Sequence, residues 1–152
     1  MSRGETVPYE TRIDTASACV LCRFFGAVST TEFTRAFTNY TEHPGFRPDA
    51  AILTDGRQAG ALPISYREVA AQVARTMPAL SRLSPEARII LLAERDDQFG
   101  MARMLQQVLH AVTSVAVIVT RSEPDALTRA GCPDPDIAAL ARRLGDPVLC
   151  SA

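Results

Sequence analysis

The sequence predicts one α/β domain whose sheet is mostly parallel and carries an antiparallel hairpin at its N-terminal end. Two strand-like stretches near the N-terminus lie so close together that only a hairpin can join them. After them, short apolar runs alternate with stretches in which apolar residues recur at helical spacing, as expected of parallel strands connected by helices. The 152 residues have the length of one domain, and no repeat or linker divides them.

Five strands are expected where apolar or alternating residues are bounded by polar or turn-forming ones. They are residues 7–14, 18–28, 50–53, 88–94 and 115–119. The fourth contains Ile-Ile-Leu-Leu-Ala without a polar residue, which is typical of a strand covered on both faces. The segment 56–63 has two glycines, one proline and no periodicity, so it is expected to be a loop.

Five helices are expected between and after these strands. They are residues 29–43, 65–82, 98–112, 122–131 and 135–144. Ser29 with Glu32 and Ser65 with Glu68 have the spacing of a capping box, which marks the start of the first two. The last helix is amphipathic and belongs to a C-terminal extension, 133–152, that either packs on the same domain or reaches another copy.

Bulk charge and hydropathy limit the classes of partner. Sixteen basic and 17 acidic residues give a net charge of −1, so no basic surface for nucleic acid is implied. No apolar run approaches the roughly 18 residues of a membrane-spanning helix. The polar N-terminal residues do not resemble a secretory signal, so a cytoplasmic protein without membrane insertion is expected.

The four cysteines are expected to be free thiols, because export is not expected. Cys19 and Cys22 form a CxxC, but within a strand the two side chains point to opposite faces. Buried structural thiols are therefore favoured over metal or redox chemistry. With only His43 and His110 elsewhere, no second ligand pair has zinc spacing, and no metal or other cofactor is expected.

No motif of a known catalytic class is present. The chain lacks GxSxG, a P-loop and GxGxxG, the usual marks of hydrolases, nucleotide binding and dinucleotide binding. Asp96 and Asp97 are adjacent carboxylates, but beside a helix start they are better suited to its dipole than to acid–base work. An enzyme is not expected, and one that uses Cys22 or Cys132 as nucleophile is the least favoured class.

The carboxyl edge of the predicted sheet is the first candidate surface. Ligands of open α/β sheets bind where parallel strands end and the next helices begin. Asp55 closes a strand there, and Arg57 is a candidate for attracting an anion; the alternative is a solvated loop followed by a helix cap. The candidate ligand- or partner-binding residues are Asp55, Arg57, Ser65, Tyr66, Asp97 and Arg103.

The helix predicted over 98–112 carries the second candidate surface. Its apolar residues fill an arc of about 160°, wider than the somewhat more than 100° that contact with a sheet requires. Met101 and Met104 lie at the edge of this arc. Two interpretations stay open: an exposed strip for a partner or a second copy, or a wide core contact.

The order of elements and two local patterns resemble the STAS-like superfamily, typified by the bacterial anti-sigma-factor antagonists. The stretches Ile89–Ala93 and Phe99-Gly100-Met101-Ala102-Arg103-Met104 look like a subgroup of small bacterial STAS-like proteins, in which a buried strand precedes a similar helix. The helix over 31–40, Pro48-Asp49 and Asp55-Gly56-Arg57 also match that layout. The resemblance spans about residues 7–130.

The resemblance implies a regulatory protein but not its switch. Antagonists of that family are controlled by phosphorylation of a serine just after the aspartate that ends the central strand. Here Gly56, Arg57 and Gln58 follow Asp55, and the next hydroxyl is that of Ser65. The leading hypothesis is a non-enzymatic interaction module that binds a protein partner or itself, as a homodimer. The alternative is a binder of a small anionic or lipophilic ligand in a cleft between sheet and helices.

Overall fold

The computed structural model describes residues 8–14, 16, 18–60 and 65–150 and contains a mixed six-stranded sheet. The strands are β1 (Tyr9–Ile13), β2 (Cys19–Gly26), β3 (Ala51–Ala59), β4 (Arg88–Leu92), β5 (Ala116–Thr120) and β6 (Leu149–Cys150). Their spatial order is β5-β4-β3-β2-β1-β6. Strands β2 to β5 are parallel, whereas β1 is antiparallel to both β2 and β6. The predicted fold class, with its N-terminal hairpin, is confirmed.

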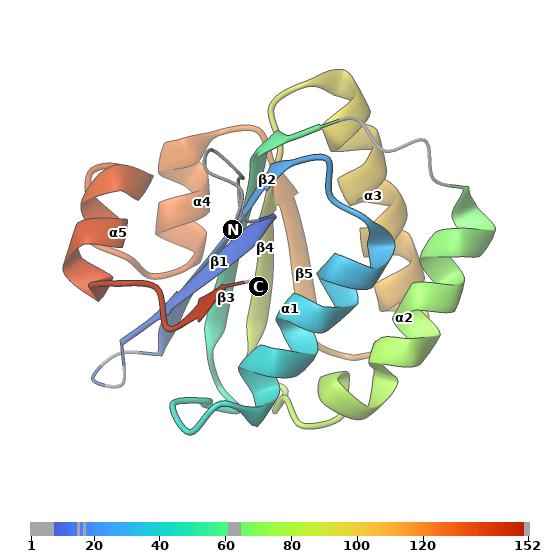
Figure 1. Cartoon of the computed structure of the whole chain (residues 1–152), viewed down its shortest axis with the longest axis horizontal. Coiled ribbons are helices and arrows are strands. Elements are labelled where there is room, and N and C mark those ends of the chain that lie inside the picture. The colour runs from blue at the N-terminus through green and yellow to red at the C-terminus, as the bar shows by residue number, and fades with distance from the viewer. Residues whose placement is uncertain (1–7, 15, 17, 61–64, 151–152) are drawn as a thin grey trace, which may run out of the picture.

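Helices cover both faces of this sheet (Figure 1). They are α1 (Thr30–Glu42), α2 (Tyr66–Leu80), α3 (Asp96–His110), α4 (Glu123–Arg129) and α5 (Ile137–Leu144). The chain steps from β2 to β5 in one direction across the sheet, so right-handed crossovers place α1, α2 and α3 on the same face. The chain then returns across the other face through α4 and α5, and β6 pairs with β1.

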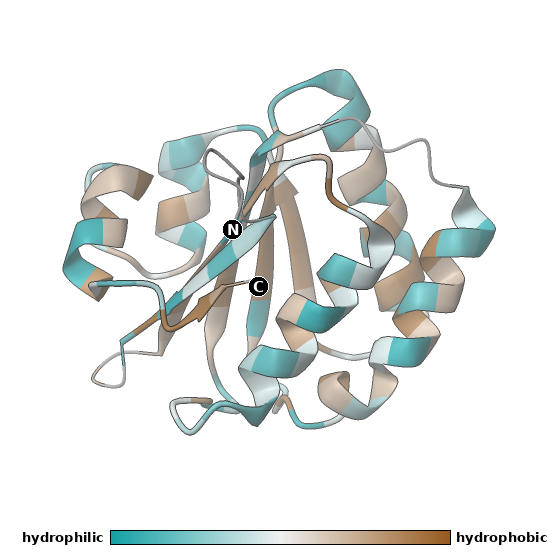
Figure 2. Cartoon of the chain, in the orientation of Figure 1, coloured by the Kyte–Doolittle hydropathy of each residue, from teal (hydrophilic) through white to brown (hydrophobic). Residues whose placement is uncertain are grey.

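The two faces bury separate apolar clusters. In β4, Ile89 and Leu91 belong to the cluster under α1, α2 and α3, whereas Ile90 and Leu92 belong to the cluster under α4 and α5. Alternate residues of this strand therefore point to opposite faces, and both are covered, as its uninterrupted apolar sequence predicts. Figure 2 shows the central strands as hydrophobic, with polar residues gathered on the outer surfaces of the helices.

Strand β3 is longer than the sequence analysis predicts. Residues 56–59, expected to be loop, continue the strand and pair with the end of β2, where Phe25 faces Gln58 and Gly26 faces Ala59. A register shift in β2 between Arg23 and Phe25 accompanies this extension. Pairing with β2 thus outweighs the weak strand propensity of the glycine-containing segment. Residues 61–64 of the expected loop lie outside the described residues.

Other boundaries follow the predicted signals closely. Both predicted capping boxes are present, at Ser29 with Glu32 and at Ser65 with Glu68. Helix α3 begins two residues earlier than expected, so that Asp96 lies in its first turn. Strand β6 was not expected at all. Among the described residues, no helix is both long enough and apolar enough to cross a membrane.

The C-terminal helix α5 packs on the sheet of its own chain. Its apolar face is buried in the same cluster as Leu21 and Leu53 of the central strands. The buried residues of α5 are Ile137, Leu140, Ala141 and Leu144. Of the two arrangements that the sequence left open for this extension, the structure therefore has the intramolecular one.

Candidate functional site

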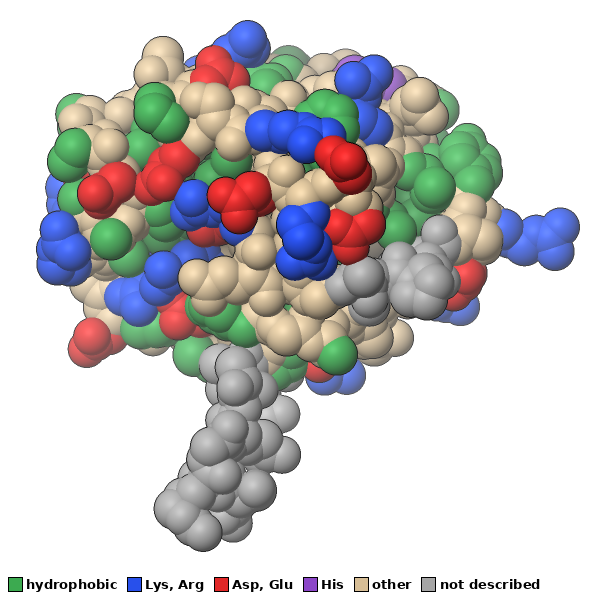
Figure 3. All heavy atoms as spheres, turned by 90° about the horizontal axis from the view of Figure 1, so that it is seen from above, with side chains coloured by type: hydrophobic (Ala, Val, Ile, Leu, Met, Phe, Trp, Pro, Cys, Tyr) green, Lys and Arg blue, Asp and Glu red, His purple; other side chains and the backbone are tan. Residues whose placement is uncertain are grey.

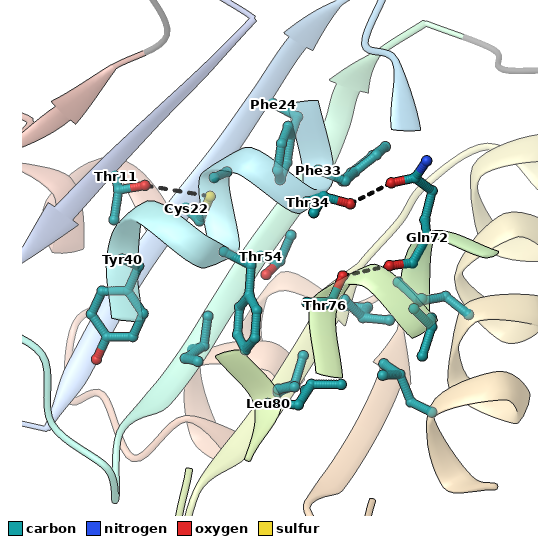
Figure 4. A pocket seen from close by; sticks show the side chains of 18 of the residues that line it. Thr11, Cys22, Phe24, Phe33, Thr34, Tyr40, Thr54, Gln72, Thr76 and Leu80 are labelled. Atoms are coloured by element: carbon teal, nitrogen blue, oxygen red, sulfur yellow. Dashed lines mark hydrogen bonds between the residues drawn. The ribbon is translucent and has the colours of Figure 1, made fainter. Parts of the chain in front are cut away.

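A cavity of about 140 Å³ lies between the sheet and the helices α1, α2 and α3. Its floor includes Val20 of β2, Ile52 of β3 and Leu91 of β4. Phe33 of α1 and Leu80 of α2 contribute to its walls (Figure 4). Among the described residues, no charged side chain lines it. This hollow in the larger apolar cluster is the main candidate for a binding site.

Short side chains in register explain why the cavity forms at this place. Thr11 of β1 faces Cys22 of β2, and Cys22 faces Thr54 of β3. All three line the cavity, so three short side chains form a row across its floor. Ala36 of α1 also lines it and adds only a methyl group. Larger residues at these positions would fill the space, as core packing usually does.

Most polar groups around the cavity already have partners. The Thr11 hydroxyl donates a hydrogen bond to the Cys22 sulfur at 3.6 Å. The Thr34 hydroxyl donates to the Gln72 side-chain oxygen at 2.5 Å, and the Thr76 hydroxyl donates to the Gln72 backbone oxygen at 2.6 Å. Within the described part of the chain, no hydrogen bond engages the hydroxyl of Thr54, which lies on the cavity floor.

Cys22 is a neutral thiol in this environment. Burial raises the pKa of its side chain to about 12, and the hydrogen bond from Thr11 opposes this shift only in part. A thiol with such a pKa is almost entirely protonated near neutral pH and is therefore a poor nucleophile. Cys22 contributes to the shape of the cavity floor, and its environment does not activate it for chemistry.

A second, smaller cavity of about 80 Å³ adjoins the first. The two share lining residues from α1, α3 and the sheet, so they lie next to each other. The shared residues are Phe33, Thr54, Leu91 and Leu105. The smaller cavity extends toward the start of α3, where Asp97 and Gln98 line it. Asp97 is paired with Arg95 at 3.1 Å, and this contact lowers the pKa of the Asp97 carboxyl.

Asp55 and Arg57, predicted as part of a docking edge, form an ion network on the face of the sheet opposite the cavity. The Arg57 guanidinium donates two hydrogen bonds of 2.9 Å to the Asp55 carboxylate, which is only 4% exposed. A third bond of 2.9 Å reaches Glu123 at the start of α4. Glu123 in turn accepts from the backbone N–H of Ile137 at 2.6 Å. Arg57 is therefore held between two carboxylates, which leaves it poorly suited to attract a further anion.

The other predicted binding residues are distributed over separate places. Ser65 caps α2, and Tyr66 is exposed beside it. Arg103 on α3 lies with its guanidinium 6.0 Å from the ring centre of Phe99. Among the residues that the structure describes, no hydrogen bond or ion pair joins Ser65 or Tyr66 to the Asp55 network.

The surface at the carboxyl ends of the parallel strands carries both signs of charge. Figure 3 shows acidic and basic side chains interspersed on the upper face. Several of them form ion pairs at or near this edge. The pairs are Arg57–Glu123, Arg95–Asp97 and Arg121–Asp96. Such a surface has no dominant sign of charge that would select a strongly charged partner.

The Ser65 hydroxyl accepts the backbone N–H of Glu68 at 3.2 Å, as a helix cap does. We predict that Ser65→Ala lowers the free energy of unfolding by about 1 kcal/mol, because one N–H at the helix start loses its acceptor. Urea denaturation measures this value, and Ser81→Ala at the opposite end of α2 serves as a comparison. An unchanged unfolding midpoint for Ser65→Ala would show that the cap contributes nothing.

Met101 and Met104 are half-buried and pack against the apolar cluster under α3. Met101 also lines the smaller cavity. Of the two interpretations that the sequence leaves open, this packing favours the wide core contact for both residues. An exposed interface strip is not needed to explain why the apolar arc of α3 is wide.

Cys19 and Cys132 form a second buried thiol site, under α4 and α5. Their sulfur atoms lie 2.8 Å apart, whereas Cys22 points to the opposite face. The hydrogen bond between the two thiols lowers the pKa of Cys132 and raises the pKa of Cys19. Once Cys132 has ionised, Cys19 would have to lose its proton beside a thiolate, which is unfavourable. In the described residues, no three His, Cys, Asp or Glu side chains are placed to hold a metal ion.

The cavity residues Thr11, Thr54 and Gln72 are not among the site residues predicted from the sequence. A usable signal was nevertheless present, since Thr54 interrupts a short apolar run at a position that faces the helices. Comparison of the chain with protein-family models, with curated proteins and with solved structures gave no match. The function is therefore argued from the geometry of the site.

Proposed function

We propose that this protein binds a small, predominantly apolar molecule between the sheet and the helices α1, α2 and α3, without catalysing a reaction. The observation that carries the proposal is the 140 Å³ cavity with its uncharged, mainly apolar lining. An apolar cavity of about 150 Å³ in another protein core is large enough to bind benzene. A packed domain of this size seldom leaves such a space without a use or a cost in stability.

The lining supports one of the two ligand classes that the sequence leaves open. An anion would need a cationic side chain or several N–H donors, and none of the described side chains that line the cavity is charged. A lipophilic ligand gains free energy from contact with Phe37, Leu80 and Leu109, all of which line the space. The proposal is therefore the lipophilic member of that pair.

The proposal predicts saturable binding of toluene, measured by proton–nitrogen NMR spectra of the labelled chain. Resonances of α1, α2 and β3 are expected to shift, because these elements enclose the cavity. Resonances of α4 and α5 are expected to stay in place and provide an internal control. Shifts that do not saturate, or that spread evenly over both faces, would overturn the proposal.

A regulatory interaction module that self-associates is the second proposal. It is supported by Tyr66, whose side chain is 57% exposed at the start of α2. Aromatic residues in such positions are common at protein interfaces. Sedimentation of the wild-type chain and of Tyr66→Ala discriminates the two proposals. A dimer that the substitution dissociates favours the interaction module. If the wild type and the variant are both monomeric, only the ligand-binding proposal remains.

A further inference from the structure

We infer that the ligand is uncharged and elongated, and that one hydroxyl or carbonyl oxygen near its middle forms a hydrogen bond with Thr54. This inference rests on the proposed function, because it specifies the chemistry of the molecule in the same cavity. It has three independent supports: the position of the Thr54 hydroxyl, the adjacency of the two cavities and the distribution of charge around them.

The first support is the Thr54 hydroxyl. Thr54 lies in the middle of the sheet, between Cys22 of β2 and Leu91 of β4. In the part of the chain that the structure describes, its hydroxyl has no hydrogen-bond partner, unlike those of Thr11, Thr34 and Thr76 around the same cavity. The hydroxyl is not among the fully buried polar atoms, so it is accessible from the cavity, and a ligand oxygen there can supply the hydrogen bond that it lacks within the protein.

The second support is the shape of the space. Thr54 lines both the 140 Å³ cavity and the 80 Å³ cavity and is therefore part of the wall that they share. A ligand that fills both has an apolar part beside Leu80 and Leu109, a middle part at Thr54 and an end near Gln98. A compact ligand would leave one of the two cavities empty. The polar atom that Thr54 recognises therefore lies along the ligand and not at its end.

The third support is the sign of the surrounding charge. The only charged residue among those lining either cavity in the described chain is Asp97, in the smaller one. Its carboxylate repels an anionic ligand group, and its pairing with Arg95 at 3.1 Å reduces its attraction for a cation. An uncharged oxygen fits this environment better than a carboxylate or an ammonium group does.

The test uses three probes with the same number of carbon atoms: butylbenzene, a secondary alcohol of phenylbutane and phenylbutanoate. Dissociation constants are measured by NMR for the wild type, for Thr54→Val and for Thr76→Val. Valine has nearly the shape of threonine but no hydroxyl. Thr76 lines the same cavity, and its hydroxyl is already bonded to the Gln72 backbone oxygen, so Thr76→Val is the matched control.

We expect Thr54→Val to weaken binding of the alcohol by about threefold to tenfold, the usual value of one hydrogen bond. Binding of butylbenzene is expected to be unchanged by either substitution, and phenylbutanoate is expected to bind the wild type most weakly. If Thr54→Val affects the alcohol and the hydrocarbon equally, or if phenylbutanoate binds most tightly, the inference is wrong although the proposed function stands. If butylbenzene does not bind the wild type, the proposed function itself fails.

Discussion

Replacing Arg57 by alanine is expected to lower the free energy of unfolding by about 3 kcal/mol, the typical cost of leaving a buried charge without its partner. Asp55 is 4% exposed and accepts two hydrogen bonds from the Arg57 guanidinium, besides one from the Arg57 backbone N–H. Without the guanidinium, this carboxylate would be buried without a counter-charge. The bond from Arg57 to Glu123, which ties β3 to the start of α4, would be lost as well. Urea denaturation, followed by circular dichroism, measures the change.

Arg47→Ala is the matched control for this prediction. Arg47 also contacts an aspartate two residues away, but both side chains of its pair with Asp49 are more than 40% exposed, at 42% and 44%. Exposed ion pairs contribute about 0–1 kcal/mol, so this substitution is expected to have little effect. The loss in the free energy of unfolding for Arg57→Lys is expected to lie between those for Arg57→Ala and Arg47→Ala, because lysine keeps the charge but not the bidentate hydrogen bonding.

The stability of Arg57→Ala also distinguishes a structural role from an interaction role for Asp55 and Arg57, which the sequence places at the carboxyl edge of the sheet. A loss of stability for Arg57→Ala identifies the Asp55–Arg57–Glu123 network as a structural connection between the sheet and α4. If Arg57→Ala is instead as stable as Arg47→Ala, the network contributes nothing, and an interaction role for Arg57 becomes the better explanation.

Local signals in the sequence predict much of the fold because they act over a few residues. The capping pairs at Ser29 and Ser65 start helices where expected, since each satisfies N–H groups three residues away. The apolar run of β4 predicts a central strand, because both of its faces must be covered. These features depend on neighbours in the chain, so a sequence without any alignment is sufficient to recognise them.

Features that depend on distant pairing are not predictable in the same way. Residues 56–59 become strand only because the end of β2 lies beside them. The two-residue strand β6 exists because Leu149 reaches Thr11 at the other end of the chain. Neither segment has enough strand propensity of its own to be recognised.

The site shows the same division between local and distant information. The sequence places Asp55 and Arg57 close together, but it cannot show that Glu123, 66 residues beyond Arg57, completes their network. Similarly, Thr11, Cys22 and Thr54 form one row only through the register of three strands. A one-residue change of register would turn these side chains to the other face, so the cavity floor has no signature in the linear sequence.

Filling the cavity from within is the substitution with the largest expected effect on binding. Ala36 on α1 is 2% exposed and lines the 140 Å³ cavity, so Ala36→Leu adds three carbon atoms inside that space. The affinity for toluene is expected to fall by at least about tenfold, or about 1.4 kcal/mol, because the ligand and the new side chain compete for the same volume. The free energy of unfolding is expected to be unchanged or raised by about 0.5–2 kcal/mol, as for other cavity-filling substitutions.

A toluene titration of the wild type beside Ala36→Leu therefore tests most directly whether this cavity is the binding site. The control is Ala74→Leu, which makes the same chemical change on the exposed side of α2. Saturable binding is expected for the wild type and for Ala74→Leu, and its loss is expected in a stably folded Ala36→Leu. Equal toluene affinity for all three proteins would contradict this expectation, because the ligand would then bind somewhere other than this cavity.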